Sequence, residues 1–435
     1  MLQLTPTPSR GIPPLADAPV AALPDTVPPC RHCGARLDLV LADLGLSPVA
    51  NDYVEPQDYA RGEMFYPLEA RVCPRCRLAQ TRDLLAADAI FRDDYAYFSS
   101  YSSSWLAHAQ RYVEAMVERF DLGPGARHVE VASNDGYLLQ YSQAAGLRCL
   151  GIEPCQSVAL AARAKGIETR IEFFGTSYAQ RLRAEGWSAD LLTGNNVLAH
   201  VPDVNDFLQG VALLLAPDGV ATFEVQHLLR LMQRHQFDTI YHEHFSYYSL
   251  IAAQHVFAAA GLEIFDVELL ETHGGSIRFF AAPASAGRVP TARVAAVLAE
   301  ERAYGLDGDA VYRRWNEEVK HSKRVLVELL SGIKAGGGSI AAYGAPAKAA
   351  TLLNYCGIGR DVIDFAVDRA HSKQGRFIPG VRIPILPPEA IFQARPDYLL
   401  VLVWNLKDEV MAQMADIRRW GGRFILPLPI AQVEP

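Results

Sequence analysis

The middle of the chain alternates between short apolar runs and longer stretches whose apolar residues recur at helical spacing. Helices are expected at about 105–120 and between 200 and 218. The apolar runs are predicted to be strands at 128–131, 149–154, 190–200 and 219–225, with a turn at Asp218-Gly219 before the last one. This alternation predicts an α/β fold with a doubly wound parallel sheet, whose ligand lies at the carboxyl ends of its strands.

The pattern changes after residue 250. A helix is expected at 252–260, and the runs 262–267 and 276–281 predict a hairpin with His273-Gly274-Gly275 in its turn. An antiparallel pair at the end of a parallel sheet fits a methyltransferase-type sheet better than a dehydrogenase sheet. Residues 284–334 are charged and helical in pattern, which predicts a connector between two units.

A second strand–turn–helix pattern begins at residue 339. Gly344 lies in the predicted turn and Lys348 in the first turn of the predicted helix. Backbone amides at a helix N-terminus and an ammonium group suit a phosphate, although an ordinary strand-to-helix turn has the same pattern. Strands expected at 362–367 and 398–404 make this part a smaller Rossmann-like unit, and a basic loop with Lys373 and Arg376 lies between them.

Length and charge limit the possible classes of protein. A chain of 435 residues is expected to form two or three domains. The formal net charge of -8 argues against bulk binding of nucleic acid, which requires an excess of lysine and arginine. No apolar run is long enough to span a bilayer, and the N-terminus lacks a secretory-signal pattern. Seven cysteines, an odd number, fit a reducing compartment, and a cytoplasmic location is expected.

Four of the cysteines form two C-x-x-C pairs, Cys30/Cys33 and Cys73/Cys76. Two such pairs place four thiolates on tight turns, the tetrahedral arrangement that zinc prefers. Four thiolates close the coordination shell, so the expected zinc is structural and stabilises a small module. Four unrelated buried cysteines are the alternative. The proline-rich residues 1–29 before the first pair are expected to form a flexible tail.

The turn after the first predicted strand has the residue types of a ligand-binding turn. It runs from Glu130 to Gly136, and Glu153 follows about 20 residues later, where a carboxylate can accept the hydroxyls of a ribose. The turn is not G-x-G-x-x-G, because Ala132 and Asn134 stand where glycines are usual. Asparagine tolerates left-handed backbone, so the turn remains feasible.

Tyr241-His242-Glu243-His244 is the most reactive stretch of the chain. A histidine can take a proton near neutral pH, a glutamate can orient it, and a tyrosine can donate to a developing oxyanion. The stretch follows one predicted strand, and Asn195, Asn196 and His200 follow its neighbour, so all should face one crevice. A polar helix cap is the alternative. A catalytic metal is excluded by spacing, because H-E-x-x-H is absent.

Aromatic residues between Asp94 and Trp105, including Tyr95 and Tyr97, fit a loop that lines a pocket or, equally, packing between domains.

Four motifs follow one another along the chain: the two C-x-x-C pairs, the Glu130–Gly136 turn, the Tyr241–His244 stretch and the turn from Gly344 to Lys348. Together and in this order, they resemble the family of S-adenosylmethionine-dependent sugar C-methyltransferases that act on nucleotide-linked keto-deoxysugars. The resemblance covers the chain after residue 29. It implies a flexible tail at 1–29, a zinc-binding substrate domain at 30–104, a methyltransferase domain at 105–284, and connector helices with a C-terminal Rossmann-like nucleotide-binding domain at 285–435.

The resemblance also implies roles for residues. His244 is the expected base, with Tyr241, Glu243 and His200 around the sugar. The residues expected at S-adenosylmethionine are Glu130, Ala132, Asn134, Asp135, Gly136, Glu153, Asn195 and Asn196. Those expected at the substrate are Tyr95, Tyr97, Lys348, Lys373 and Arg376. Structural zinc is expected on Cys30, Cys33, Cys73 and Cys76.

The expected reaction is methyl transfer to a ring carbon, C3 or else C5, of a nucleotide-linked 4-keto-6-deoxysugar through an enolate. The substrate partner is the nucleotide-diphosphate sugar, without nucleic acid or membrane, and a monomer or weak homo-oligomer is expected. An O- or N-methyltransferase of a small metabolite and a non-catalytic sugar-nucleotide-binding protein are the alternatives. The acidic charge disfavours an RNA methyltransferase.

Overall fold

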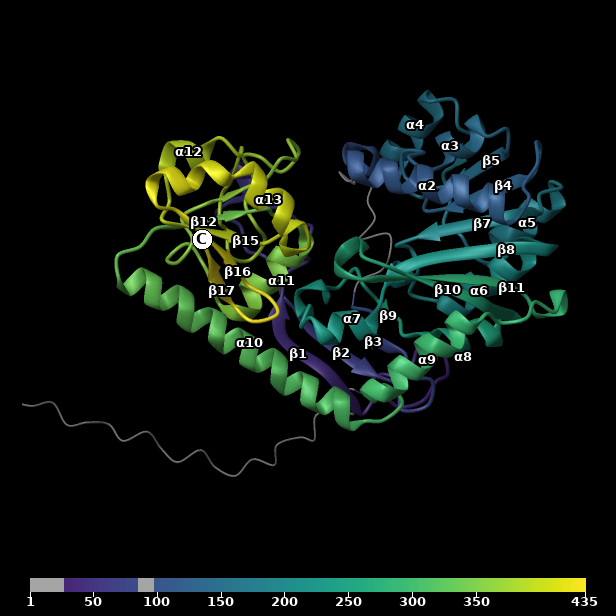
Figure 1. Ribbon diagram of the computed structural model, residues 1–435, viewed down its shortest axis with the longest axis horizontal. Coiled ribbons are helices and arrows are strands. Elements are labelled where there is room, and N and C mark those ends of the chain that lie inside the picture. Colours follow the sequence, from purple (N-terminus) through teal and green to yellow (C-terminus); the bar gives the residue numbers. More distant parts are fainter. Residues whose placement is uncertain (1–26, 85–97) are drawn as a thin grey trace, which may run out of the picture.

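Three β-sheets organise the molecule (Figure 1). The computed structural model describes residues 27–84 and 98–435. The central sheet and its helices form one lobe, and the C-terminal sheet forms the other. The N-terminal sheet lies at the base between them. The expected tail, apart from 27–29, and the expected pocket loop with Tyr95 and Tyr97 lie outside the described residues.

The first sheet takes strands from two distant parts of the chain. Its antiparallel order is β1 (Leu39–Ser47), β2 (Tyr66–Val72), β3 (Ala79–Thr81) and β9 (Ser246–Tyr247). Strand β9 begins two residues after His244 and pairs Tyr247 with Ala79. The sheet also shares a core with the C-terminal lobe, because Leu41, Trp315 and Ile340 belong to one buried cluster. The N-terminal module is therefore packed into the rest of the protein.

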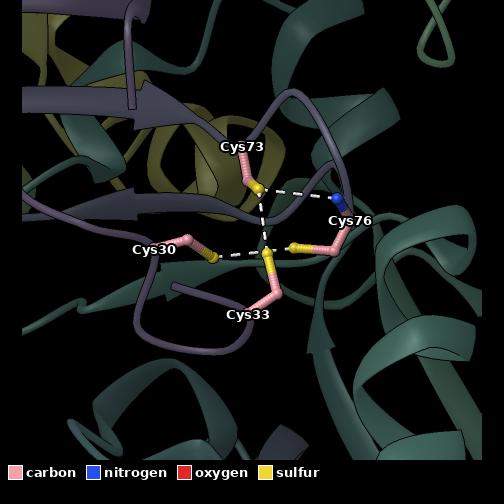
Figure 2. A group of neighbouring side chains, drawn as sticks. All are labelled: Cys30, Cys33, Cys73 and Cys76. Carbon is pink, nitrogen blue, oxygen red and sulfur yellow. Dashed lines mark hydrogen bonds between the residues drawn. The ribbon is translucent and has the colours of Figure 1, made fainter. Parts of the chain in front are cut away.

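The four cysteines of the two C-x-x-C pairs meet beside this sheet, as predicted. Figure 2 shows their side chains pointing toward one another, and all four sulfur atoms lie within 4.8 Å of one another. The Sγ atoms of Cys33 and Cys73 are 3.4 Å apart, and those of Cys30 and Cys76 are 3.6 Å apart. Tetrahedral zinc with Zn–S bonds of about 2.3 Å needs sulfurs roughly 3.8 Å apart, so the cluster fits zinc.

Sulfur charge in this cluster is favoured by backbone groups. The amides of Arg75 and Cys76 donate to Cys73 Sγ at 3.4 and 3.5 Å. Hydrogen bonds from the neighbouring thiols of Cys73 and Cys76 hold the pKa of Cys30 well below its usual range, and the same contacts raise the pKa of Cys73 and Cys76. The fit to zinc therefore comes from the spacing of the four sulfurs and from the two amides at Cys73.

The central sheet confirms the predicted doubly wound α/β fold. Its order is β10-β11-β8-β7-β4-β5-β6, and only β11 runs against its neighbours. The predicted hairpin is therefore present, with β11 inserted between two strands of the opposite direction. The strands are β4 (Arg127–Val131), β5 (Arg148–Ile152), β6 (Thr169–Arg170), β7 (Ala189–Asn195), β8 (Leu215–Gln226), β10 (Leu262–Leu270) and β11 (Ser276–Pro283).

Helices cover both faces of the central sheet. On one face lie α2 (Ser103–Arg119), α3 (Leu139–Ala144) and α4 (Gln156–Ala164); on the other lie α5 (Thr176–Ala184), α6 (Val204–Leu214), α8 (Leu250–Ala259) and α9 (Ala292–Tyr304). Helix α7 (Leu228–Gln233) follows β8. Each face has its own buried cluster, as a doubly wound sheet requires.

The expected turn at Asp218-Gly219 lies inside β8, at an irregularity of its pairing with β7. The register shifts there from Ala189 opposite Leu215 to Leu191 opposite Val220, so residues 216–219 stand outside the regular ladder. A Cβ on Gly219 would lie 2.5 Å from the carbonyl oxygen of Ala189 and 3.0 Å from the amide nitrogen of Ala216. The chain therefore folds back tightly at the predicted place, and the glycine leaves room for this close approach.

The C-terminal sheet is parallel except for its last strand, and its order is β14-β13-β12-β15-β16-β17. The strand expected at 362–367 is short, because Val362 and Ile363 donate to the Gly359 carbonyl in a turn. The strands are β12 (Ile340–Tyr343), β13 (Ala366–Val367), β14 (Ile385–Leu386), β15 (Tyr398–Val401), β16 (Arg423–Leu426) and β17 (Gln432–Glu434).

The helices of this lobe are α10 (Ala310–Ala335), α11 (Ala347–Cys356), α12 (Ala390–Ala394) and α13 (Lys407–Gln413). Helices α9 and α10 form the predicted helical connector and run along the base of the molecule in Figure 1. No helix in residues 27–84 and 98–435 has the length and apolar character needed to cross a membrane.

We predict that Cys73→Ser releases zinc and lowers the unfolding midpoint by about 5 °C or more, because metal binding contributes folding free energy to such modules. Metal analysis and thermal unfolding of the purified protein would measure both effects. Cys149→Ser changes a cysteine outside the cluster and is the matched control, which should keep full zinc. Equal zinc content in the two variants would contradict the assignment of the ligands.

Candidate active site

Two segments meet at the carboxyl ends of β7 and β8. A short 3-10 helix, η3 (Leu198–His200), follows β7, and the Tyr241–His244 stretch follows η4 (Phe237–Thr239). The Phe245 amide donates to the Ala199 carbonyl at 2.6 Å. The ring centroids of His200 and His244 are 4.7 Å apart. The predicted crevice partners therefore lie side by side, as the strand order required.

The tautomer of His244 follows from its hydrogen bonds. Its Nδ1 lies 2.9 Å from the Thr239 carbonyl oxygen, which can only accept, so Nδ1 carries the proton. Nε2 then has the lone pair and accepts from the Tyr241 hydroxyl at 2.7 Å. Burial, and then the nearby His200, hold the pKa of His244 well below its usual range. His244 is therefore a neutral imidazole whose basic nitrogen faces Tyr241.

His200 has the same tautomer. Its Nδ1 donates to the Glu243 carbonyl at 2.7 Å, so its Nε2 also has the lone pair. Burial lowers the pKa of His200 to about 4, and the hydrogen bond to Glu243 opposes this shift. A neutral imidazole in this tautomer accepts at Nε2 and cannot donate from that atom.

Glu243 is a buried carboxyl with an N-terminal partner. Its side chain Oε2 accepts from Asn51 Nδ2 at 2.5 Å, while Oε1 has no hydrogen-bond partner among the described residues. Burial raises the pKa of Glu243 to about 7, and the Asn51 hydrogen bond opposes the shift. The carboxyl can therefore change charge near neutral pH. Sequence reasoning missed Asn51, a lone loop asparagine that no motif marks.

His242 lies away from this group. It is 3% exposed, its Nε2 lies 3.3 Å from the Pro67 carbonyl oxygen, and its ring meets Tyr66 edge-on at 5.9 Å. Its contacts are therefore with the first two residues of β2, in the N-terminal sheet.

The turn after β4 adopts left-handed backbone at three positions. The φ angles are 56° at Ala132, 49° at Asn134 and 74° at Gly136. A Cβ on Gly136 would lie 2.4 Å from Ile167 Cδ1, so this position needs glycine for space as well as for conformation. The asparagine takes a left-handed conformation, as the sequence suggested.

Two acidic residues lie at this turn. Glu153 accepts from the amides of Asn134 at 3.0 Å and Cys155 at 2.9 Å, while burial raises its pKa. Glu130 is fully buried in β4, and burial raises its pKa well above the usual range, with Tyr137 opposing the shift. Glu153 thus holds the turn together at the end of β5.

The other residues expected at this turn separate into two groups. Asn195 donates to the Tyr137 hydroxyl at 3.4 Å, and its buried Oδ1 has no partner among the described residues. Asp135 instead pairs with Lys165 at 3.0 Å, and Asn196 Nδ2 lies 3.3 Å from His273 Nε2. A left-handed turn with a buried amide oxygen left to bind fits the adenosyl and methionyl groups of S-adenosylmethionine.

The three basic residues expected at the substrate lie at the junction with the C-terminal lobe. Lys348 contacts Asn405 Oδ1 and lies 4.2 Å from the centroid of the Trp404 ring. Burial lowers the pKa of Lys348 to about 8, with Asp238 opposing. Lys373 donates to the Ala345 carbonyl at 3.0 Å, as does Tyr53 at 2.5 Å.

Arg376 behaves differently from the two lysines. It pairs with Glu55 of the N-terminal module at 2.6 Å. The structure thus places Lys373 on the Gly344–Pro346 turn and Lys348 in the helix that follows it, and gives Arg376 an ion pair between modules.

Comparison with known proteins gives three consecutive matches. Family models described as "Putative zinc binding domain", "Methyltransferase domain" and "C-methyltransferase C-terminal domain" match residues 30–91, 105–267 and 271–429. The C-methyltransferase NovU of Streptomyces niveus is 38% identical over 404 residues, which cover 93% of this chain and 96% of that protein.

Solved methyltransferases match the central part alone. Magnesium protoporphyrin IX methyltransferase from Synechocystis PCC 6803 is 16% identical, covers 46% of this chain and 99% of its own, and has a TM-score of 0.34. An S-adenosylmethionine-dependent methyltransferase from Clostridium acetobutylicum is 13% identical, with 40% and 89% coverage and a TM-score of 0.32. Likenesses this low carry no argument.

The sequence matches, the four-cysteine cluster and the methyltransferase sheet agree with one another. The chain belongs to the C-methyltransferase family with an N-terminal zinc-binding domain, and it is an S-adenosylmethionine-dependent C-methyltransferase.

Proposed function

We propose that this enzyme methylates a ring carbon beside the ketone of a nucleotide-linked 4-keto-6-deoxysugar, C3 in preference to C5, through an enolate. One observation carries the proposal: His244, a neutral imidazole with its lone pair on Nε2, lies 2.7 Å from the Tyr241 hydroxyl. Methylation of carbon needs a base to make the nucleophile and a donor to hold the resulting oxyanion. These two side chains meet both needs.

The proposed proton transfer uses Nε2 of His244. The C–H bond beside the ketone breaks, the proton goes to Nε2, and the electron pair becomes the enolate with negative charge on the ketone oxygen. The Tyr241 hydroxyl, which hydrogen-bonds Nε2 in this structure, turns to that oxygen. His200 accepts at Nε2, so we assign it a sugar hydroxyl instead of the enolate oxygen.

Glu243 has a separate part in this proposal. Its Oε1 has no partner among the described residues, so it can accept a hydroxyl or amine of the sugar. Asn51 holds the other oxygen and fixes the direction of the carboxyl.

The methyl donor is held by the turn after β4 in this proposal. Ala132, Asn134 and Gly136 shape the turn, Glu153 faces the ribose, and Asn195 offers its buried Oδ1. When bound there, S-adenosylmethionine supplies an electrophilic methyl group. Asp135 pairs with Lys165 through Oδ2, but its buried Oδ1 has no partner among the described residues and can also face the donor, whereas Asn196 contacts His273.

The far end of the substrate belongs, in this proposal, to the C-terminal lobe at 285–435, with the zinc-bearing module at 30–104 on the other side. The N-terminus of α11 and the ammonium groups of Lys348 and Lys373 support a diphosphate site. Tight binding of a remote group can hold the reacting carbon in place.

His244→Ala is expected to lower solvent hydrogen exchange at the carbon beside the ketone by about a hundredfold or more, because this exchange requires the base but no methyl donor. Mass spectrometry of keto-deoxysugar nucleotides incubated in deuterated buffer without methyl donor would measure it. Tyr241→Phe should also lose about a hundredfold, through the oxyanion. His242→Gln, two residues away and packed on Pro67, is the matched control. Unchanged exchange in His244→Ala would refute the assignment of the base.

The rate of exchange is expected to rise with pH through an inflection near 7, where Glu243 ionises. The low pKa values of His200 and His244 keep both rings neutral at that pH, so they add no inflection there. In Glu243→Gln the inflection near 7 should disappear, since the amide cannot ionise. Rates measured from pH 5.5 to about 8.5 in both proteins test this. An identical profile in the variant would assign the inflection to another group.

A further inference from the structure

The carbonyl that fixes His244 belongs to a short segment, Phe237–Ile240, held by the C-terminal lobe. The Thr239 carbonyl oxygen of this segment accepts from His244 Nδ1 at 2.9 Å. The Thr239 carbonyl lies in the planar peptide unit between residues 239 and 240, so its direction depends on how the chain is held on both sides of Thr239, at residues 238 and 240. Both of these neighbours have partners more than a hundred residues away.

Asp238 is held by the loop after β15. Its Oδ2 accepts from Trp404 Nε1 at 2.6 Å, and the carboxyl is completely buried. The Lys348 ammonium lies over the same indole ring, 4.2 Å from its centroid. On the other lobe Gly274 packs against this ring so closely that a Cβ there would lie 2.6 Å from a ring carbon of Trp404. The indole is therefore fixed between the two lobes and cannot be displaced without losing the Asp238 contact.

Helix α11 holds the two ends of the segment. Thr351 Oγ1 donates to the Ile240 carbonyl at 3.1 Å, and the Tyr355 ring meets Phe237 edge-on at 5.4 Å. Lys348 stands in the first turn of the same helix. The segment that orients the base therefore rests on the element that, in the proposed function, binds the diphosphate.

We propose that Asp238 and Trp404 are positioning residues for His244: their hydrogen bond between the lobes holds the Thr239 carbonyl on Nδ1 and so keeps the lone pair of Nε2 facing the substrate. This inference rests on the proposed function for its catalytic consequence. Its structural part, the tautomer of His244, stands independently of any substrate.

The groups around the two residues are known. His244 faces His200 from η3, Tyr241 and Tyr247 from its own segment, and the charge of His273 from the hairpin turn. Asp238 faces Lys348 and Cys356 from α11 and Trp404. Burial raises the pKa of Asp238 to about 6, while Lys348 and Trp404 favour its ionised form.

The test is Trp404→Phe, which keeps an aromatic ring and removes the indole N–H. Trp420→Phe is the matched control, since Trp420 Nε1 donates to the Pro396 carbonyl at 3.0 Å in the same lobe, away from the site. Asp238→Asn is the second variant, because its amide oxygen still accepts from the indole. Thermal unfolding first establishes that all three variants are folded.

Two measurements are then compared. Nitrogen NMR of histidine-labelled protein, with His244 assigned by its loss in His244→Gln, reports the tautomer and the pKa of the ring. We expect a single Nδ1–H tautomer in the wild type and in Trp420→Phe, and a mixture with a raised pKa in Trp404→Phe. In hydrogen exchange, kcat should fall about tenfold or more in Trp404→Phe with little change in KM, and less in Asp238→Asn.

The outcomes separate the two proposals. If Trp404→Phe matches Trp420→Phe in the tautomer of His244 and in kcat, or changes KM alone, the positioning inference is wrong. If the wild type exchanges no keto-sugar nucleotide, the proposed function fails. The NMR comparison still decides whether Trp404 holds the tautomer.

Discussion

A histidine has one ring proton in its neutral form, and the site depends on where that proton lies. The Thr239 carbonyl accepts a hydrogen bond from Nδ1 of His244 and so keeps the proton on that nitrogen, and the Glu243 carbonyl does the same for Nδ1 of His200. Each ring therefore has its lone pair on Nε2, and Nε2 of His244 accepts from the Tyr241 hydroxyl. Burial keeps both rings uncharged. Contacts from the N-terminal sheet and from the C-terminal lobe hold the segments that contain these two carbonyls.

The zinc-binding module contacts the chain just after Glu243 through the N-terminal sheet. Cys73 and Cys76 close the turn before β3, and Thr81 at the end of β3 donates to the Phe245 carbonyl through its amide, and to the His244 carbonyl through its hydroxyl at 2.8 Å. Strand β3 then pairs with β9. The four-cysteine cluster thus supports the backbone that follows His244, the proposed base, which gives a structural zinc a defined place in the architecture of the site.

The hydrophobic periodicity predicted the individual strands and helices. The order of the strands then places His200 beside His244, because parallel strands end at the same edge of a sheet. The left-handed turn at 132–136 could also be predicted, since asparagine and glycine tolerate that backbone. Sequence gave no sign of the pairing of β9 with β3, or of Asn51 and Trp404 at the site. Each of these depends on a contact between residues more than a hundred apart, and no residue type marks such a contact. The fold-back at Asp218-Gly219 could be predicted too, because such a close approach of the backbone selects glycine.

Burying so many polar groups together costs free energy that only hydrogen bonds can offset. The two imidazoles meet this by staying neutral and donating to carbonyls, whereas the carboxyl of Glu243 has a single oxygen partnered and a pKa raised to about 7. A buried oxygen without a hydrogen bond destabilises the folded protein, and this cost in free energy is removed when a bound ligand donates a hydroxyl to it. Of the groups beside Tyr241, Glu243 is therefore suited to select the substrate through its unmatched oxygen, whereas His244, with both ring nitrogens hydrogen-bonded, is suited to the proposed chemistry.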